Sequence, residues 1–164
     1  MERALSTSLS RATAQRTERE VDSLLEESRP ALFRLALAIM ASRDRAEDVT
    51  QDALLRASRS RSALASVDEP SAWLRTTLVR CAMSALKRRP QIEVRPGASR
   101  DPALDLSVAA TLNRLSPADR TLLALAHFQE MSYAEISELL GIPEGTVASR
   151  LHTARAAFRK EWKE

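Results

Sequence analysis

Apolar side chains recur along this chain at spacings of three and four residues, the period of an α-helix with one buried face. They keep this period over residues 18–41, again over 45–60, and a third time over 70–89. Pro30 lies inside the first segment and predicts a break or kink there, because proline removes a backbone hydrogen bond. The small polar residues of 60–69 predict a loop. The first half of the chain is therefore expected to form a small bundle of helices.

The second half repeats the pattern in shorter segments. A helix is predicted at 104–115, and a second is opened by Ser116 and Pro117, a favoured cap and first-turn pair. Residues 132–155, SYAEISELLGIPEGTVASRLHTAR, then read as two helices around a tight break at 141–143. This is the outline of a helix-turn-helix, whose second helix lies in the DNA major groove.

The capping residues of this segment support the interpretation. Ser132 and Glu135 have the spacing of a capping box, and Gly141 supplies the left-handed residue that ends a helix. In the second helix one face is apolar: Val147, Leu151, Ala154, Phe158 and, one turn further on, Trp162. The opposite face carries Thr146, Ser149, Arg150, His152, Thr153 and Arg155. We expect the apolar face to pack inward and the polar face to meet DNA.

The segment between the two halves has a different composition. Residues 91–103 contain prolines and glycine without apolar periodicity, which is typical of a linker. Residues 1–17 are rich in Ser, Thr and Arg and predict a flexible tail. We therefore expect an all-α protein of two small helical domains, 18–90 and 104–164, joined by a flexible linker.

Composition narrows the function further. The single cysteine, Cys81, excludes an internal disulfide framework and a cysteine-rich zinc site. His127 and His152 are isolated, and there is neither a nucleophile motif nor a glycine-rich phosphate loop, so we expect no metal, no cofactor and no enzyme. No apolar run is long enough to span a bilayer, so we expect a cytoplasmic protein without membrane insertion. The net charge of +3 is too small to indicate a partner.

Both halves resemble one family, the extracytoplasmic-function (group IV) sigma factors of bacterial RNA polymerase, within the sigma-70 family. The second half is similar to sigma region 4 through Leu115-Ser116-Pro117, Arg120, Ser132-Tyr133, Glu135-Ile136, Leu140-Gly141-Ile142, Gly145-Thr146-Val147, Ser149-Arg150-Leu151 and Ala154-Arg155. The first half is similar to region 2 through Ala46-Glu47-Asp48, Gln51-Asp52, Trp73-Leu74 and Lys87-Arg88-Arg89. A lone helix-turn-helix is a weak signal, but two regions in the expected order make the resemblance specific.

The resemblance implies a transcription initiation factor that binds core RNA polymerase, directs it to promoters with −35 and −10 elements, and helps to open the DNA. Docking on the β′ clamp helices would fall to Asp48, Gln51, Asp52 and Arg56. The −35 element would be bound by Ser132, Tyr133, Glu144, Gly145, Thr146, Ser149, Arg150, Thr153 and Arg155. The −10 element, with a flipped base, would be held by Arg75, Arg80, Ser84, Lys87, Arg88 and Arg89. The polymerase β flap and an anti-sigma factor would be further partners.

Two of these assignments have a plainer interpretation from the residues alone. The acidic residues Glu47, Asp48 and Asp52 suit the start of any solvated helix, and the basic residues 87–89 suit the end of one, because both complement the helix dipole. Trp73 and Leu74 fit a hydrophobic core better than a base-stacking site.

The sequence also departs from the usual sigma pattern at positions expected to contact DNA. Arg80 and Ser84 stand where Asn and Asp are common, Ala148 and Thr153 where Lys and Arg are frequent, and 58–69 contains no aromatic residue. These departures motivate one alternative, a sigma mimic that sequesters an anti-sigma factor without using DNA. A second alternative is a simple helix-turn-helix repressor, which would have no use for the acidic surface of the second helix.

Overall fold

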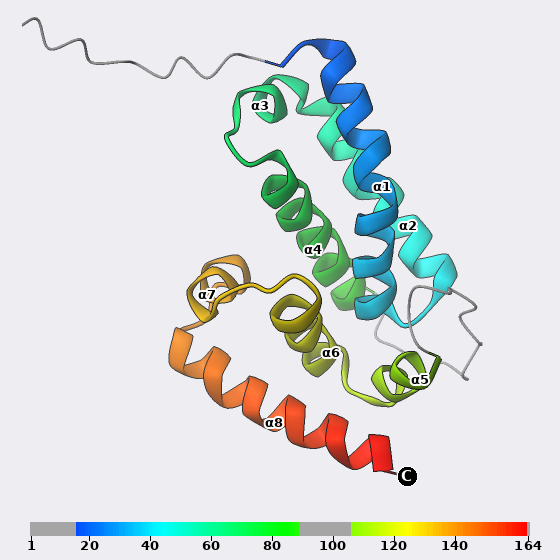
Figure 1. The fold of residues 1–164 in the computed structure, drawn as a ribbon, viewed down its shortest axis with the longest axis vertical. Helices are drawn as coiled ribbons and strands as arrows, with labels where there is room; N and C mark the ends of the chain where they lie inside the picture. Colours follow the sequence, from blue (N-terminus) through cyan, green and yellow to red (C-terminus); the bar gives the residue numbers. More distant parts are fainter. Residues whose placement is uncertain (1–15, 89–105, 164) are drawn as a thin grey trace, which may run out of the picture.

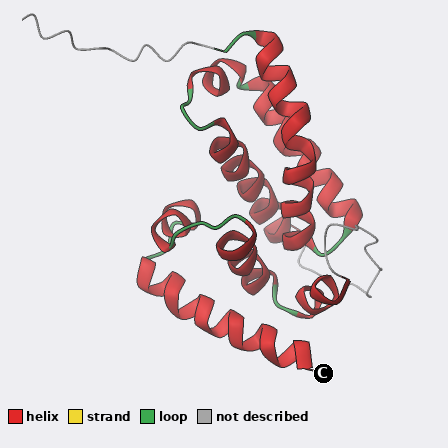
Figure 2. Cartoon of the chain, viewed as in Figure 1, coloured by secondary structure: helices red, strands yellow, loops and turns green. Residues whose placement is uncertain are grey.

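The structure of the chain, a computed structural model, describes residues 16–88 and 106–163. Within these stretches the chain is helical and carries no strand, which confirms the all-α prediction (Figure 2). The first stretch forms α1 (Glu18–Met40), α2 (Arg43–Arg59), α3 (Arg61–Ser66) and α4 (Pro70–Arg88). The second forms α5 (Leu106–Arg114), α6 (Pro117–Leu123), the π-helical turn η1 (Ala124–Phe128), α7 (Tyr133–Leu140) and α8 (Glu144–Lys163). The predicted linker and the tail up to residue 15 lie outside the described residues.

The first group of helices is a bundle in which α1, α2 and α4 pack along one another, with α3 at one end (Figure 1). The inward faces predicted for α2 and α4 are confirmed at the positions that lie in the core of the bundle. On α2 the buried positions include Ala46, Val49, Ala53 and Ala57, and on α4 Leu74, Leu78 and Cys81. The small alanines of α2 allow the helices to approach closely, and the leucines of α4 fill the space between them.

The sequence predicted a break or a kink at Pro30, and the break does not occur. Helix α1 continues through this residue from Glu18 to Met40. Both Pro30 and Glu26, whose carbonyl loses its usual partner, are exposed, so water can bond the freed oxygen. Leu25 and Leu32, on either side, are buried and hold the two parts of the helix against the same core.

Two other boundaries differ from the prediction. The expected loop 60–69 contains the short helix α3, because Leu64 and Ala65 reach the core and hold one helical turn there. A pattern of six residues is too short to show a helical period in the sequence. Helix α2 begins at Arg43 instead of Arg45, and only its N-cap, Ser42, separates it from the left-handed residue Ala41 that ends α1.

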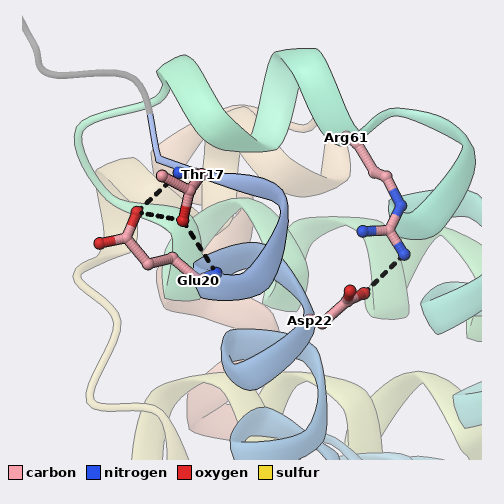
Figure 3. A network of polar contacts seen from close by, with 4 residues as sticks. All are labelled: Thr17, Glu20, Asp22 and Arg61. Atoms are coloured by element: carbon pink, nitrogen blue, oxygen red, sulfur yellow. Dashed lines mark hydrogen bonds and ion pairs between the residues drawn. The ribbon is translucent and has the colours of Figure 1, made fainter.

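The last residues of the predicted tail are also ordered. Thr17 caps α1: its hydroxyl accepts a bond from the Glu20 backbone N–H at 3.3 Å, and the Glu20 carboxylate accepts from the Thr17 N–H at 2.6 Å (Figure 3). Arg16 donates to the backbone oxygen of Val67 at 2.9 Å. Nearby, Arg61 of α3 forms an ion pair with Asp22 of α1 at 2.6 Å. These contacts fasten the start of α1 to α3 and to the turn after it.

The second group of helices packs around α8 and α6. Val147, Leu151 and Ala154 are fully buried, as predicted. Trp162 does not continue this buried face: it is 47% exposed and stacks on Phe158 with ring centroids 5.7 Å apart.

The two groups are in contact. Helix α6 and η1 lie against α1, and the buried side chains of both groups form one continuous cluster. The sequence predicted two domains on a tether and gave no reason for them to pack together.

Candidate nucleic-acid interface

The helix-turn-helix has the local geometry that its sequence predicts. The Ser132 hydroxyl accepts from the Glu135 N–H at 3.3 Å, and the Glu135 carboxylate accepts from the Ser132 N–H at 2.7 Å, which completes the capping box. Gly141 has a φ of 66°, the left-handed conformation that ends α7. Ser137 adds a bond that was not predicted, donating from its hydroxyl to the Ile142 carbonyl at 2.6 Å. The capping box holds the start of α7, and Gly141 with the Ser137–Ile142 bond holds the turn that leads to α8.

Replacing Ser132 with alanine is expected to lower the free energy of unfolding by about 0.5–2 kcal/mol, because the Glu135 N–H loses its acceptor and the Glu135 carboxylate loses the hydroxyl donor. The hydrogen bonds from Ser132 lower the pKa of Glu135 in the folded protein. A lowered pKa stabilises the fold above the unfolded pKa and loses this effect as pH falls through the folded pKa. The difference between wild type and Ser132→Ala in urea unfolding should therefore shrink in acid. An equal difference at pH 7 and pH 3 would contradict the role of the carboxylate.

Helix α8 presents a polar face to solvent. Ser149, Arg150, His152 and Thr153 are exposed, and so are Glu144 and Gly145 at the start of the helix. In the free protein the Ser149 hydroxyl donates to the Thr146 carbonyl at 3.1 Å, and the Thr153 hydroxyl donates to the Ser149 carbonyl at 3.2 Å. The oxygens of both hydroxyls remain able to accept, and either group can rotate toward a DNA phosphate or base.

The two predicted arginines of this helix occupy different environments. Arg150 is exposed and makes no hydrogen bond or ion pair with any residue that the structure describes, so it is available for DNA. Arg155 is half-buried and donates to His127 Nε2 at 3.3 Å and to Tyr133 Oη at 3.4 Å. It therefore ties α8 to η1 and α7. The sequence did not predict these hydrogen bonds, because no local pattern brings His127 next to Arg155.

The residues expected at the −10 element lie on α4. Arg80, Lys87 and Arg88 are exposed, Arg75 and Ser84 are half-buried, and Arg89 lies outside the described residues. The structure brings the first part of this helix against α7. A groove of about 220 Å³ is lined from α4 by Arg75 and Arg80, among others, and from α7 by residues that include Glu135 and Glu138. The two expected DNA surfaces are thus neighbours.

The residues expected to dock on polymerase are all exposed on α2: Asp48, Gln51, Asp52 and Arg56. Beside them, α1 and α2 form a hollow of about 510 Å³. Arg29 and Phe33 of α1 line it, with Asp48 and Gln51 of α2. Arg29 donates to Gln51 Oε1 at 2.9 Å. The sequence did not predict a contribution from α1, because the half-exposed Phe33 looks like part of the periodic apolar face.

A second hollow lies on the helix-turn-helix group and was also missed. It measures about 340 Å³ and has an apolar floor that includes Leu112, Leu123 and Phe158. His127, Phe128, Arg155 and Arg159 line its edge. Phe128 is 43% exposed, an unusual position for a large aromatic side chain. This apolar groove with a basic edge is suited to a partner helix.

The chemistry of the other candidate groups is limited. Burial raises the pKa of the Cys81 thiol, which keeps it protonated and unreactive. Among the residues that the structure describes, no cluster of three or more His, Cys, Asp or Glu side chains is placed to hold a metal ion. None of the described helices has the length and apolar character needed to cross a membrane.

Comparison with known proteins identifies both groups of helices. Residues 24–91 match the model of sigma-70 region 2, and residues 105–158 match the model of sigma-70, region 4. The chain is 31% identical over 147 residues to the ECF RNA polymerase sigma factor SigM of Mycobacterium tuberculosis, which covers 85% of this chain and 75% of SigM. It is 32% identical over 151 residues to SigL of the same species, which covers 84% of this chain and 85% of SigL.

A solved structure shows the same fold. The sigma factor RpoE of Bartonella quintana, crystallised with the anti-sigma factor NepR, superposes with a TM-score of 0.72 at 24% identity, covering 88% of this chain and 98% of that one. The two regions, their order and the relatives agree with the helix-turn-helix of the second group. This chain belongs to the extracytoplasmic-function family of RNA polymerase sigma factors, the alternative sigma factors of transcription initiation.

Proposed function

We propose that this sigma factor divides promoter recognition between its two groups of helices. Residues 18–90 would bind core polymerase and the −10 element, and residues 104–164 would bind the −35 element. The observation that supports this division best is the exposed polar face of α8. This helix follows α7, which is capped at both ends, by Ser132 and by Gly141. Linked sites of this kind bind together far more tightly than either alone, because the second contact becomes intramolecular.

Polymerase docking would use surfaces on both groups. The exposed residues Asp48, Gln51, Asp52 and Arg56 of α2 would meet the β′ clamp helices, with the Arg29–Gln51 bond at the edge of that face. The apolar groove that includes Leu112 and Phe158 would receive the β flap, because its floor can bury the apolar side of a helix. No group in the chain is proposed to catalyse a reaction, and the chemistry belongs to the polymerase.

The −10 element would be opened and held along α4. A base taken out of its stack can be read on its pairing edge, at the cost of unstacking energy. Arg80, Lys87 and Arg88 are exposed and positioned to bind phosphates, which offsets part of that cost. Trp73 is half-buried against the core, so it would support α4 while the arginines contact the strand.

The −35 element would be read by α8, and Arg150 offers the sharpest test. Arg150→Ala is expected to weaken binding to a −35 duplex by about 1–3 kcal/mol if the guanidinium contacts a base edge. Fluorescence anisotropy with a labelled duplex measures the change. Lys160→Ala is the matched control, because it removes an exposed cation further along the same helix. Equal losses in the two variants would assign Arg150 a general electrostatic role only.

The relatives also suggest how the protein is regulated and where it acts. The Bartonella structure holds its sigma factor with an anti-sigma factor, and we propose that an anti-sigma factor binds this chain as well. A protein that serves RNA polymerase works where the polymerase is, so we propose a cytoplasmic location.

Run-off transcription with purified core polymerase and a pool of genomic promoter fragments tests the function as a whole. New discrete transcripts that share upstream motifs are expected only when this chain is added. Core binding without any transcript would favour the sigma mimic, which the departures at Arg80, Ser84, Ala148 and Thr153 motivate. A pull-down for a small anti-sigma partner would then test that alternative. If the chain does not bind core polymerase, the result would contradict the proposed function and favour the helix-turn-helix repressor.

A further inference from the structure

Arg155 of α8 is held by two side chains that come from other elements. Its Nε donates to His127 Nε2 at 3.3 Å, and its Nη1 donates to Tyr133 Oη at 3.4 Å. His127 belongs to the π-helical turn η1, and Tyr133 is the first residue of α7. The guanidinium of a residue proposed to bind the −35 element is therefore oriented from outside its own helix.

Both acceptors of Arg155 are uncharged groups. The side chain is half-buried and forms no ion pair with any residue that the structure describes. A carboxylate partner would offset much of the positive charge of the guanidinium, whereas an imidazole and a phenol orient it and leave its charge intact. The N–H groups that are not used in these two bonds stay available for a phosphate oxygen. This environment suits an arginine that binds an anion.

The bond from Arg155 requires a neutral imidazole at His127. Nε2 can accept a hydrogen bond only through its lone pair, so the single proton of the neutral ring must lie on Nδ1. A protonated ring carries a proton on both nitrogens and a positive charge. It can no longer accept from Arg155, and it repels the guanidinium instead. The arginine is therefore held only while His127 is neutral.

The groups around His127 do not compensate an added positive charge. Helix α8 contributes two cations, Arg155 and Arg159, to the hollow that His127 lines, and α7 contributes the uncharged phenol of Tyr133. The sides formed by α5 and α6 are apolar and consist of Val108, Leu112 and Leu123. Among the described residues no carboxylate lines this hollow. A charged imidazole would thus face two cations.

The backbone brings His127 to α8 through an unusual connection. In the turn Ala124–Phe128 the helix is π-helical, and the N–H of Gln129 bonds to the carbonyl of the first residue of the turn at 3.2 Å. Glu130, which follows, adopts a left-handed φ of 51°. Such turns and such φ values in residues other than glycine cost free energy, and they are frequent at functional sites. This connection places His127 and Tyr133 on the same guanidinium.

From these contacts we infer that His127 is a positioning residue for recognition of the −35 element. In its neutral form it holds, together with Tyr133, the guanidinium of Arg155 in the orientation that binds a DNA phosphate, and protonation releases the arginine. Phosphate contacts fix the register in which a recognition helix meets the bases, so a released Arg155 lowers the preference for the −35 sequence. The inference rests on the proposed role of α8 and adds to it a residue that precedes the helix-turn-helix.

Histidine is the side chain that ordinarily changes charge between pH 5 and pH 8, so the two pH values frame the test. The chain contains two histidines, and a His152→Gln background, used as the reference chain, leaves only His127. His127→Gln keeps a neutral acceptor at every pH, and His127→Lys is a permanent cation without an acceptor. Ala156→Lys is the matched control, because it adds a cation at the exposed neighbour of Arg155 and leaves both acceptors in place.

The first measurement needs no DNA. The ¹⁵Nε chemical shift of Arg155 is followed by NMR in the full chain, detected through ¹³Cζ so that exchange with water does not remove the signal, and Arg155→Lys assigns it. We expect the shift of the reference chain to change between pH 8 and pH 5. It should stay constant in His127→Gln, and in His127→Lys it should have the pH 5 value throughout. Because His127 is exposed, all variants should keep the helical circular dichroism of the reference chain.

The second measurement compares binding to a labelled −35 duplex, taken from the motif found by run-off transcription, with binding to a scrambled duplex of equal length. The ratio of the two affinities removes the general effect of added positive charge, which acts on both duplexes. In the reference chain we expect this ratio to fall roughly two- to tenfold from pH 8 to pH 5, the usual effect of one hydrogen bond on an equilibrium constant. The ratio should stay high in His127→Gln and in Ala156→Lys at pH 8, and be low in His127→Lys at both pH values.

The outcomes separate this inference from the proposed function. Tighter binding of His127→Lys to both duplexes with an unchanged ratio would assign His127 a general phosphate contact and overturn the positioning role. A reference chain that prefers the −35 duplex equally at both pH values, with a constant Arg155 shift, would overturn that role and leave the proposed function standing. A reference chain without any preference at pH 8 would contradict the proposed function of α8, and the role of His127 would fall with it. If His127→Lys fails to fold, the reference chain and His127→Gln decide between these outcomes.

Discussion

Leu151→Ala is expected to lower the free energy of unfolding by about 2–5 kcal/mol. Leu151 is fully buried on α8, the helix on which α5, α6 and α7 pack. Alanine would remove the transfer free energy of the side chain and leave a cavity that neighbouring helices fill only in part. Urea unfolding followed by circular dichroism measures the change.

His152→Ala is the matched control for this prediction. The neighbouring side chain is exposed, so its removal should change stability by no more than about 0.5 kcal/mol. Because the buried side chains of both groups form one cluster, the loss at Leu151 should also reduce the stability of α1 and α4. A midpoint for Leu151→Ala equal to that of wild type would show that the buried face of α8 has been assigned wrongly.

Asp52→Arg is expected to abolish binding to core RNA polymerase. The side chain is exposed on α2, beside Asp48 and Gln51, so the substitution reverses the charge of the proposed docking face without disturbing the core. Placing like charges against each other in an interface costs several kcal/mol, enough to remove a micromolar complex. Co-purification of tagged protein with core polymerase measures the loss.

Asp68→Arg provides the control for charge reversal. It makes the same change at an exposed position between α3 and α4, away from the docking face, and should leave core binding intact. Circular dichroism should show equal helicity in both variants. Normal co-purification of Asp52→Arg would refute the assignment of α2 to polymerase docking.

Features that depend on neighbours in the sequence were predicted correctly. The capping box of Ser132 and Glu135, the left-handed Gly141 and the buried positions Val147 and Leu151 all follow from contacts within one or two helical turns. Caps and periodicity act over three or four residues, so a single sequence contains the information that determines them. The residue roles at DNA and polymerase stay predictions.

Predictions failed where packing decided the outcome. Pro30 is an ordinary helix breaker by local rules, but the exposed face of α1 tolerates it and the core holds the helix on both sides. The six residues of α3 become helical because Leu64 reaches the core. The DNA contact of Arg155 stays a prediction, but packing adds what the sequence did not show: Arg155 donates hydrogen bonds to His127 and Tyr133.

The sequence by itself therefore determined the helical class, the helix-turn-helix, the acidic face of α2 and the family. Only the tertiary structure showed that the two groups of helices share a core and that Arg120 caps α1 at Ile39. The apolar run at the end of α1, Leu35 to Ala41, carried a signal, since a helix that is apolar all round must be covered on all sides. It could not name the covering element, because residues 81 positions apart meet only through the fold.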